Sequence, residues 1–436
     1  MTKVLWLSDF NCSTGFGTVA HNILAQLQKT GRYEFTVVGI NHTGKPYDRN
    51  KWPFDIYPAV DMQMAGEAYR DVFGRQQFLD LLIKGDYDLV FVLQDTFIVA
   101  PIGAELEKVK DYLKKNNQKV FTSIYYYPVD GLLETDTIKK SVGAFDFPVT
   151  YTQFAKTETQ RVCPELNPAI IPHGVDLQTF RPLDPIEVAE FRAKFFSSHA
   201  DGKFIVTNVN RNQPRKDIAR TIAAFAKFHL VRPDSYLYLL MQMNDVGGNV
   251  ARIADLFGLK PIIDYAVPVM FNTFSGYPIE RVNQIYNASD VVVSSTLGEG
   301  WGLSSIEAMA TKTPVIFPNN TALTEIVTGR GRLVKSGEGN SWVCLGQQDM
   351  NQIRPTVDVD DLARGMIEAY DNRDEEQIEA AYNWVQTLSW DRVGEMWQAV
   401  FEQAAGQALP ERNDQCYRCA NKWKKCELHN MEVMHV

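Results

Sequence analysis

The stretch "DVVVSSTLGEGWGLSSIEAMA", residues 290–310, contains a strand pattern, a glycine-rich loop and the start of a helix. Its valines form the short apolar run of a buried strand. Gly298, Gly300 and Gly302 let the following loop approach a ligand closely, and the two serines that come next suit the first turn of a helix. The free N–H groups of such a turn attract an anion. Strand, loop and helix in this order are typical of parallel β-α-β folds.

Glu299 and Glu307 lie eight residues apart in this stretch. On one continuous helix they would project about 80° apart, so we place Glu299 on the loop and Glu307 a turn into the helix. Each carboxylate then accepts hydrogen bonds from a different part of one ligand. Two carboxylates beside an anion site suit a sugar nucleotide, which has two polyol ends and phosphate between them. The alternative is an ordinary loop residue and a helix-surface residue; the glycines and the buried strand favour the ligand site.

The same alternation of strands and helices runs through most of the chain. Residues 3–9, 34–41 and 88–95 are apolar runs separated by amphipathic stretches, and a second series begins at residue 204. We therefore predict an α/β protein with two Rossmann-like domains that face a cleft at the carboxyl ends of their sheets. The expected parts are an N-terminal domain (1–178), a C-terminal domain (179–380), helices that cross back to the N-terminal domain (381–411) and a tail (412–436).

Composition limits the class of protein. Hydrophobic residues make up 45% and charged residues 22% of the 436 residues, as in a globular protein. No apolar run reaches the roughly 18 residues of a membrane helix, and the N-terminus lacks a signal-peptide pattern. A net charge of −9 argues against binding a polyanion by bulk attraction. We expect a cytoplasmic protein without a membrane span that acts on small substrates.

A second group of polar residues follows the first strand of the second series. Arg211 and Lys216 lie on a loop that leads into a helix in "NVNRNQPRKDIARTIAAFAKF". Two cations beside a helix N-terminus suit a diphosphate leaving group, on which charge builds as its bond to the sugar breaks. The alternative is a pair of solvated basic residues.

These motifs together resemble the retaining glycosyltransferases of family 4, which have the GT-B fold. The resemblance rests on Arg211 and Lys216 at a spacing of five and on the Glu299 to Glu307 pair within "EGWGLSSIEAMATKTPVI". It includes "STGFG" near the N-terminus, "IPHGVDLQTF" at the domain junction and the tryptophan-rich helical end. It implies transfer of a sugar from a nucleotide-diphosphate sugar, with retention at the anomeric carbon and without a catalytic metal.

The resemblance also implies roles for single residues. Arg211 and Lys216 match the pair that holds the donor diphosphate, Glu299 lies near the donor sugar, and Glu307 binds the ribose. Further donor contacts fall to the backbone amides of Gly302 and Leu303 and to the small-residue loop with Gly15 and Gly17.

Many members of the family have a histidine after a central strand of the N-terminal domain, close to the anomeric carbon. The corresponding stretch "SIYYYPVDG" has none, and Asp130 is its expected substitute; the alternative is a turn residue before Gly131. His173 lies where the family commonly has asparagine, and we interpret it as a hinge or cleft-lining residue.

The tail "CYRCANKWKKCELHN" contains Cys416, Cys419, Cys426 and His429. Zinc prefers four such ligands, so we predict a structural zinc site here; the alternative is free cysteines in a frayed terminus. Lysines beside a tryptophan at residues 422–425 suit contact with phosphates and stacked bases, or form a solvated loop.

The acceptor therefore stays open between a glycan, which the family implies, and DNA with hydroxymethylated bases, which the tail favours. A protein of another class, a catalytically silent sugar-nucleotide or nucleic-acid binder, is the remaining alternative. The four donor-site residues Arg211, Lys216, Glu299 and Glu307 argue against it, because binding alone does not require the whole set.

Overall fold

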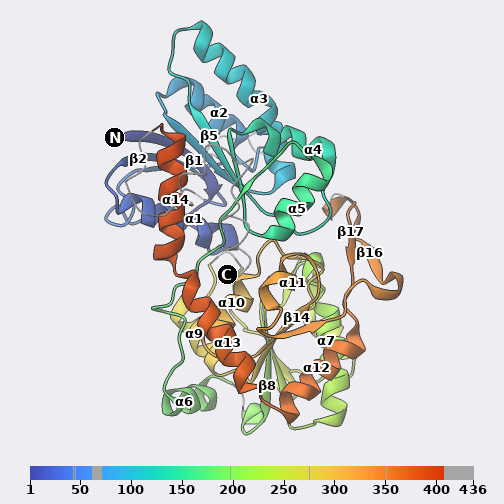
Figure 1. Ribbon diagram of the computed structural model, residues 1–436. Helices are drawn as coiled ribbons and strands as arrows, with labels where there is room; N and C mark the ends of the chain where they lie inside the picture. Colours follow the sequence, from blue (N-terminus) through green and yellow to red (C-terminus); the bar gives the residue numbers. More distant parts are fainter. Residues whose placement is uncertain are drawn as a thin grey trace. The chain divides into compact units, whose positions relative to one another are not determined.

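The computed structural model describes residues 1–406 except 43, 45, 61–70, 197, 274 and 350. By their contacts these residues form two units (Figure 1). The first contains Met1–Val129, Leu133–Gly174 and the described residues from Trp390 to residue 406; the second contains Asp130–Leu132 and Val175–Ser389. The chain thus changes unit at residues 129/130, 132/133, 174/175 and 389/390. The domain boundaries expected from the sequence are 178 and 380. The expected tail 412–436, with its four predicted zinc ligands, lies outside the described residues.

The first unit contains a seven-stranded sheet in which all neighbouring strands are parallel. The strand order β3-β2-β1-β4-β5-β6-β7 reverses direction between β1 and β4, as in other doubly wound sheets. The strands are β1 (Thr2–Asp9), β2 (Tyr33–Ile40), β3 (Asp55–Pro58), β4 (Leu89–Leu93), β5 (Thr122–Tyr127), β6 (Phe147–Thr150) and β7 (Ala169–Ile170).

Alternate residues of β1 pack on opposite faces of this sheet, because side chains alternate along a strand. Leu5 and Leu7 belong to the core beneath four helices, α2 to α5. On the other face Trp6 stacks on Phe91, with ring centroids 3.8 Å apart. The helices of the unit are α1 (Gly15–Gln28), α2 (Arg75–Lys84), α3 (Thr96–Lys115), α4 (Thr135–Lys140), α5 (Gln153–Val162) and α14 (Trp390–Ala404).

Helix α14 covers that second face beside α1, although it comes from the far end of the chain (Figure 1). Its Phe401 lies against Trp6, and Asp391 pairs with Lys29 of the α1 C-terminus at 3.1 Å. The final described helix is therefore part of the first unit, and its Trp397 is explained by packing against Phe91 and Tyr126 of the sheet.

The second unit contains a six-stranded sheet of parallel neighbours in the order β12-β9-β8-β13-β14-β15. One core lies between the sheet and α7, α8 and α12, and another includes residues of α6 and α9. The strands are β8 (Phe204–Val209), β9 (Ser235–Leu240), β12 (Tyr265–Ala266), β13 (Val291–Val293), β14 (Val315–Pro318) and β15 (Arg332–Val334). The helices are α6 (Pro185–Phe195), α7 (Ile218–Val231), α8 (Val250–Leu256), α9 (Ile279–Asn287), α10 (Leu303–Ala310), α11 (Thr321–Val327), α12 (Val359–Asp371) and α13 (Glu375–Val385).

Two small antiparallel hairpins interrupt the β-α alternation of this unit. One pairs β10 (Asn244–Asp245) with β11 (Gly248–Asn249), and the other pairs β16 (Trp342–Cys344) with β17 (Ile353–Pro355). The second hairpin lies in the connection from β15 to α12. Both were missed in the sequence, because two- and three-residue strands are too short to show a period of two.

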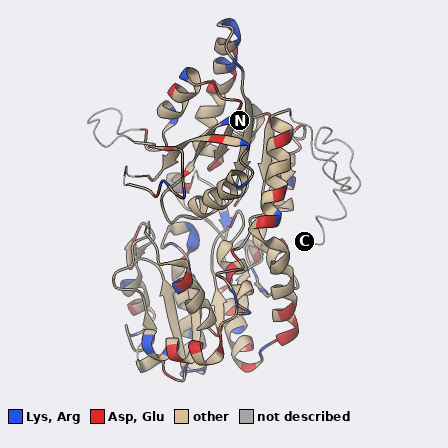
Figure 2. Cartoon of the chain, turned by 90° about the vertical axis from the view of Figure 1, so that its left-hand side faces the viewer, with Lys and Arg blue, Asp and Glu red and all other residues tan. Residues whose placement is uncertain are grey.

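None of the helices in the described part of the chain is long and apolar enough to cross a membrane. Figure 2 shows basic and acidic segments interspersed in each unit, in keeping with the mixed charge of the sequence. Among the same described residues, no three His, Cys, Asp or Glu side chains gather as a metal site would require.

Candidate functional site

The glycine-rich loop of residues 298–302 joins β13 to α10, as the sequence predicts. Gly302 precedes the helix with a φ of 100°, a left-handed conformation that favours glycine. A Cβ there would also lie 2.8 Å from Cδ2 of Leu323. Leu303 is the first helical residue, so the first-turn N–H groups of α10 follow this loop directly. Glu299 lies on the loop and Glu307 on the helix, which confirms their predicted placement.

Lys216 and Glu299 form an ion pair in which each side chain is only 12% exposed. Burial lowers the pKa of Lys216, while Glu299 opposes that effect. Burial raises the pKa of Glu299, whereas the charges of Lys216 and Arg215 lower it. The lowering is larger, so the pKa of Glu299 falls below its usual value. Each side chain therefore stabilises the charged form of the other, as a buried ion pair requires.

Arg215 extends this pair to a third residue that the sequence analysis missed. Its Nη1 lies 3.4 Å from Oε2 of Glu299 and also donates to the main-chain oxygen of Gly298. Its Nε lies 3.2 Å from Oδ2 of Asp130. The only signal for Arg215 in the sequence is its position next to Lys216. The spacing of Arg211 and Lys216 indicates those two residues as the diphosphate ligands and does not include Arg215.

Asp130 lies in this cluster, and its contacts place it in the second unit although it follows β5 in the sequence. Its other carboxylate oxygen, Oδ1, lies 3.2 Å from Nη2 of Arg354, which was also missed. Burial raises the pKa of Asp130, but Arg215 and Arg354 lower it to below its usual value. Gly298 permits this approach, because a Cβ at that position would lie 2.0 Å from the main-chain oxygen of Asp130.

Arg211 has a different partner from Lys216. Its Nε and Nη2 bind the two carboxylate oxygens of Asp245 at 2.9 and 3.2 Å. Burial raises the pKa of Asp245, but the bond from Arg211 is the first of several contacts that lower it below its usual value. The two predicted diphosphate ligands therefore share the β8–α7 connection but pair with separate carboxylates.

Glu307 also has a partner of its own. Oε2 of Glu307 accepts a hydrogen bond of 2.9 Å from the hydroxyl of Tyr286. Burial raises the pKa of Glu307 to about 7, and the bond from Tyr286 opposes that rise. Near neutral pH the side chain is thus divided between a carboxylate that accepts hydrogen bonds and a carboxyl group that can also donate one.

The predicted small-residue loop belongs to the first unit. Gly15 begins α1, and the main-chain N–H of Gly17 donates to Oγ1 of the cap residue Thr14 at 3.0 Å. The Thr14 hydroxyl donates in turn to Oδ2 of Asp9 at 2.6 Å. Asp9 closes β1, where its carboxylate also accepts hydrogen bonds from two amides. It was missed, although an acidic residue at the end of a buried strand was visible.

His173 also belongs to the first unit. It is buried, with Nδ1 2.8 Å from the hydroxyl of Tyr126. Burial lowers the pKa of His173 to about 3, so the ring is neutral at physiological pH. From the sequence we interpret it as a hinge or cleft-lining residue. The structure buries it beside Tyr126 and Tyr151, directly before the change of unit at residues 174/175, so the hinge interpretation stays a prediction.

Part of the second unit is similar to a known protein family. A family model described as "Glycosyl transferases group 1" matches residues 268–344, which include Glu299 and α10. The D-inositol 3-phosphate glycosyltransferase of Nocardia farcinica is 31% identical over 187 residues, 41% of this chain and 40% of that protein. The chain thus matches about two fifths of this relative's length.

Two solved structures share the fold over nearly the whole chain. The sucrose-phosphate synthase of Thermosynechococcus elongatus has a TM-score of 0.68 at 17% identity and covers 92% of this chain and 99% of its own. The Anabaena protein HepE, in complex with UDP and glucose, has a TM-score of 0.64 at 15% identity, with coverages of 92% and 100%. Two parallel Rossmann-like sheets and a C-terminal helical segment define the GT-B class. Within that class, residues 268–344 are similar to the group 1 glycosyltransferases, and the relative from Nocardia farcinica is a glycosyltransferase by name.

Proposed function

We propose that this protein is a retaining glycosyltransferase that moves a sugar from a nucleotide-diphosphate sugar to a hydroxyl acceptor. The observation that carries the proposal is the buried Lys216–Glu299 pair, in which Glu299 lies on the loop that leads into α10. Cations and helix N–H groups at one place suit a diphosphate, and a fixed carboxylate suits sugar hydroxyls.

Lys216 and Arg215 supply positive charge to the departing diphosphate, in the role that a divalent metal has in other glycosyltransferases. The bond between the anomeric carbon and the diphosphate oxygen breaks, and the diphosphate leaves with the electron pair. The acceptor oxygen bonds to the same face of that carbon, and its proton passes to the leaving phosphate. The amides of Gly302 and Leu303 stabilise the same negative charge, because the N-terminus of α10 carries a partial positive charge.

Glu307 binds the ribose of the donor in this proposal. Its pKa near 7 lets it accept a hydrogen bond from one ribose hydroxyl while Tyr286 holds the other side of the group. Arg211 lies on the same connection as Lys216 and adds a further cation for the diphosphate beside its pair with Asp245. The resemblance to family 4 also implies donor contacts from the loop with Gly15 and Gly17.

Two acceptors follow from separate observations. The relative named for D-inositol 3-phosphate favours a polyol or glycan acceptor. The lysines and tryptophan of residues 422–425 favour DNA with hydroxymethylated bases, and they lie outside the described residues. Transfer assays with glycans and with duplex DNA, with and without 5-hydroxymethylcytosine, distinguish the two.

The decisive test is the substitution Lys216→Ala, assayed with a panel of UDP- and GDP-sugars for hydrolysis and transfer. We expect turnover to fall about 100-fold or more, because one charged donor to the leaving group is lost. The control is Lys227→Ala. Lys227 lies exposed on α7, the helix that follows Lys216, and it pairs with Asp360.

Normal turnover in Lys216→Ala would contradict the proposed donor site. If the unchanged protein binds a UDP- or GDP-sugar but neither hydrolyses nor transfers it, the alternative of a catalytically silent binding protein is correct.

A further inference from the structure

The hairpin of β16 and β17 carries an arginine into the charged cluster. The hairpin segment, residues 336–357, lies between β15 and α12, and much of it is exposed, including the side chains of Trp342 and Ile353. In contrast to these exposed side chains, the side chain of Arg354 on β17 is buried, with only 3% exposed. An arginine buried on an exposed hairpin needs partners that compensate the cost of removing its charge from water.

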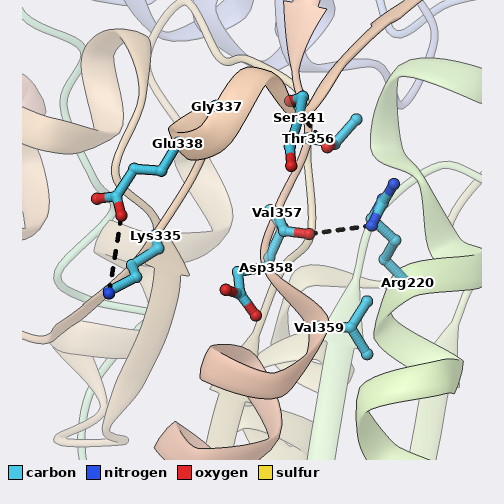
Figure 3. Close-up of a pocket in the computed structure, with 9 residues that line it drawn as sticks. All are labelled: Arg220, Lys335, Gly337, Glu338, Ser341, Thr356, Val357, Asp358 and Val359. Atoms are coloured by element: carbon cyan, nitrogen blue, oxygen red, sulfur yellow. Dashed lines mark hydrogen bonds and ion pairs between the residues drawn. The ribbon is translucent and has the colours of Figure 1, made fainter.

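The base of the hairpin is fixed to the body of the second unit (Figure 3). The main-chain N–H of Thr356 donates to the oxygen of Ser341 at 2.8 Å, which closes the hairpin. Nη1 of Arg220, on α7, donates to the main-chain oxygen of Val357 at 3.1 Å. These groups line a surface pocket of about 230 Å³ of mixed charge. The hairpin is thereby held in place two residues from Arg354.

Two carboxylates compensate Arg354. Its Nη2 lies 2.8 Å from Oδ1 of Asp349 and 3.2 Å from Oδ1 of Asp130, and Nη1 also donates to the main-chain oxygen of Asp130. Asp349 lies within the same hairpin segment, whereas Asp130 lies 224 residues before Arg354 in the sequence. Arg354 therefore contacts both the side chain and the backbone of Asp130.

Each carboxylate oxygen of Asp130 faces one arginine. Oδ1 faces Arg354 and Oδ2 faces Arg215, which continues to Glu299 and so to Lys216. Rotation of the carboxylate would break both contacts, so the two arginines fix its orientation.

We propose that Arg354 is a positioning residue of the reaction: from the hairpin, it holds the Asp130 carboxylate ionised and oriented beside the Lys216–Glu299 pair. So placed, Asp130 stabilises the positive charge that develops on the anomeric carbon when the bond to the diphosphate breaks. This inference rests on the proposed function. Arg215 and Arg354 also lower the pKa of Asp130 against the rise caused by burial, which keeps the group anionic.

The test compares the pH dependence of donor hydrolysis, with water as the acceptor, in the full-length protein and in Arg354→Gln. UDP-glucose, UDP-N-acetylglucosamine and GDP-mannose are the probes. In Arg354→Gln we expect the acid limb of the rate profile to move up by about one pH unit, because the loss of a close cation raises the pKa of a carboxylate. The rate should fall about 10-fold at pH values below the acid limb of both proteins, near pH 3 to 4, and recover in part near pH 7, with little change in KM for the donor.

Two further variants separate charge from geometry. Arg354→Lys keeps the charge but loses the planar fork, so we expect the acid limb to stay in place while the rate falls at every pH. Arg364→Gln, on α12, is the control, since Arg364 is exposed and pairs with Asp361; it should match the unchanged protein.

A second measurement needs no donor. Carboxyl ¹³C shifts of aspartate-labelled protein, assigned with Asp130→Asn, report the pKa of Asp130 directly, and this pKa should rise in Arg354→Gln. If Arg354→Gln fails to fold, Arg354→Lys carries the test through its rate alone.

An unchanged pKa of Asp130, or full activity in Arg354→Lys, would overturn the proposal. A merely structural role would lower the melting temperature of Arg354→Gln and lower its rate by the same factor at every pH. That combination of results would also overturn the proposal. Loss of activity in Lys216→Ala together with either result leaves the proposed function standing, so the two failures are distinguishable.

Discussion

At the scale of single residues, the site consists of charges that compensate one another. Lys216, Arg215 and Arg354 face Glu299, Asp130 and Asp349, so three cations are balanced by three carboxylates. A diphosphate adds negative charge to this balanced group, and it must compete with carboxylates already in contact with the cations. The carboxylates thus fix the cations in position before the diphosphate binds, so that water need not reorganise during the reaction.

Glu307 makes the stability of the protein depend on pH. Its pKa is about 7 in the folded protein and near 4.5 in an exposed chain, so the folded state holds its proton more tightly. Its contribution to the free energy of unfolding therefore decreases as the pH rises from about 4.5 to about 7 and is constant above that range. The variant Glu307→Gln lacks this group, and we expect its stability relative to the unchanged protein to increase between pH 5 and pH 8.

Urea unfolding of both proteins at several pH values measures this difference. A constant difference across the range would mean that Glu307 is ionised with an ordinary pKa. We also expect Glu307→Gln to bind the nucleotide more weakly, because it lacks the proposed ribose contact. Titration with UDP and GDP at a single pH measures this affinity.

At the scale of elements, the loop before α10 depends on the conformation of one glycine. Gly302 has a φ of 100° and lies against Leu323, so a side chain there is strained by its backbone and by its neighbour. We expect Gly302→Ala to lower stability by about 1 to 3 kcal/mol and to weaken nucleotide binding, because the first turn of α10 must shift. Gly258→Ala is a control for positive φ alone, since nothing lies within 4 Å of its Cβ position.

Thermal unfolding and nucleotide titration of both variants check this expectation. Equal binding losses in Gly302→Ala and Gly258→Ala would show that the loop before α10 has no special role in binding.

The elements themselves were largely predictable from the sequence, but the hairpins were not. The strand and helix around residues 290–310 follow from a period of two, a glycine-rich break and a period near 3.6, all of which are local. The hairpin of β16 and β17 has no such period, because its strands have three residues each. Arg354 therefore looked like an ordinary loop residue.

At the scale of the whole molecule, the described residues form two units, and the chain passes between them four times. The tail beyond residue 406 lies outside the described part, and its predicted zinc site stays a prediction from the sequence. We expect about one zinc per chain by elemental analysis, and loss of that zinc in Cys416→Ser/Cys419→Ser. The control is Cys344→Ser, because Cys344 is an exposed cysteine of β16.

Removal of residues 412–436 should leave donor hydrolysis unchanged. Transfer to hydroxymethylated DNA should fall in the truncated protein if that DNA is the acceptor. A protein without zinc, or an equal loss of hydrolysis and transfer, would contradict a separate recognition role for the tail.

The sequence by itself determined the α/β class, the two series of parallel strands, the loop with Glu299 and the resemblance to family 4, because each depends on residues close together in the chain. Only the tertiary structure decided which charges meet. It assigned Lys216 to Glu299 and Arg211 to Asp245, and it brought Arg354 to Asp130 across 224 residues. Ion pairing depends on distances of a few ångströms between side chains, and such distances exist only once the chain has folded and brought residues that are far apart in the sequence together.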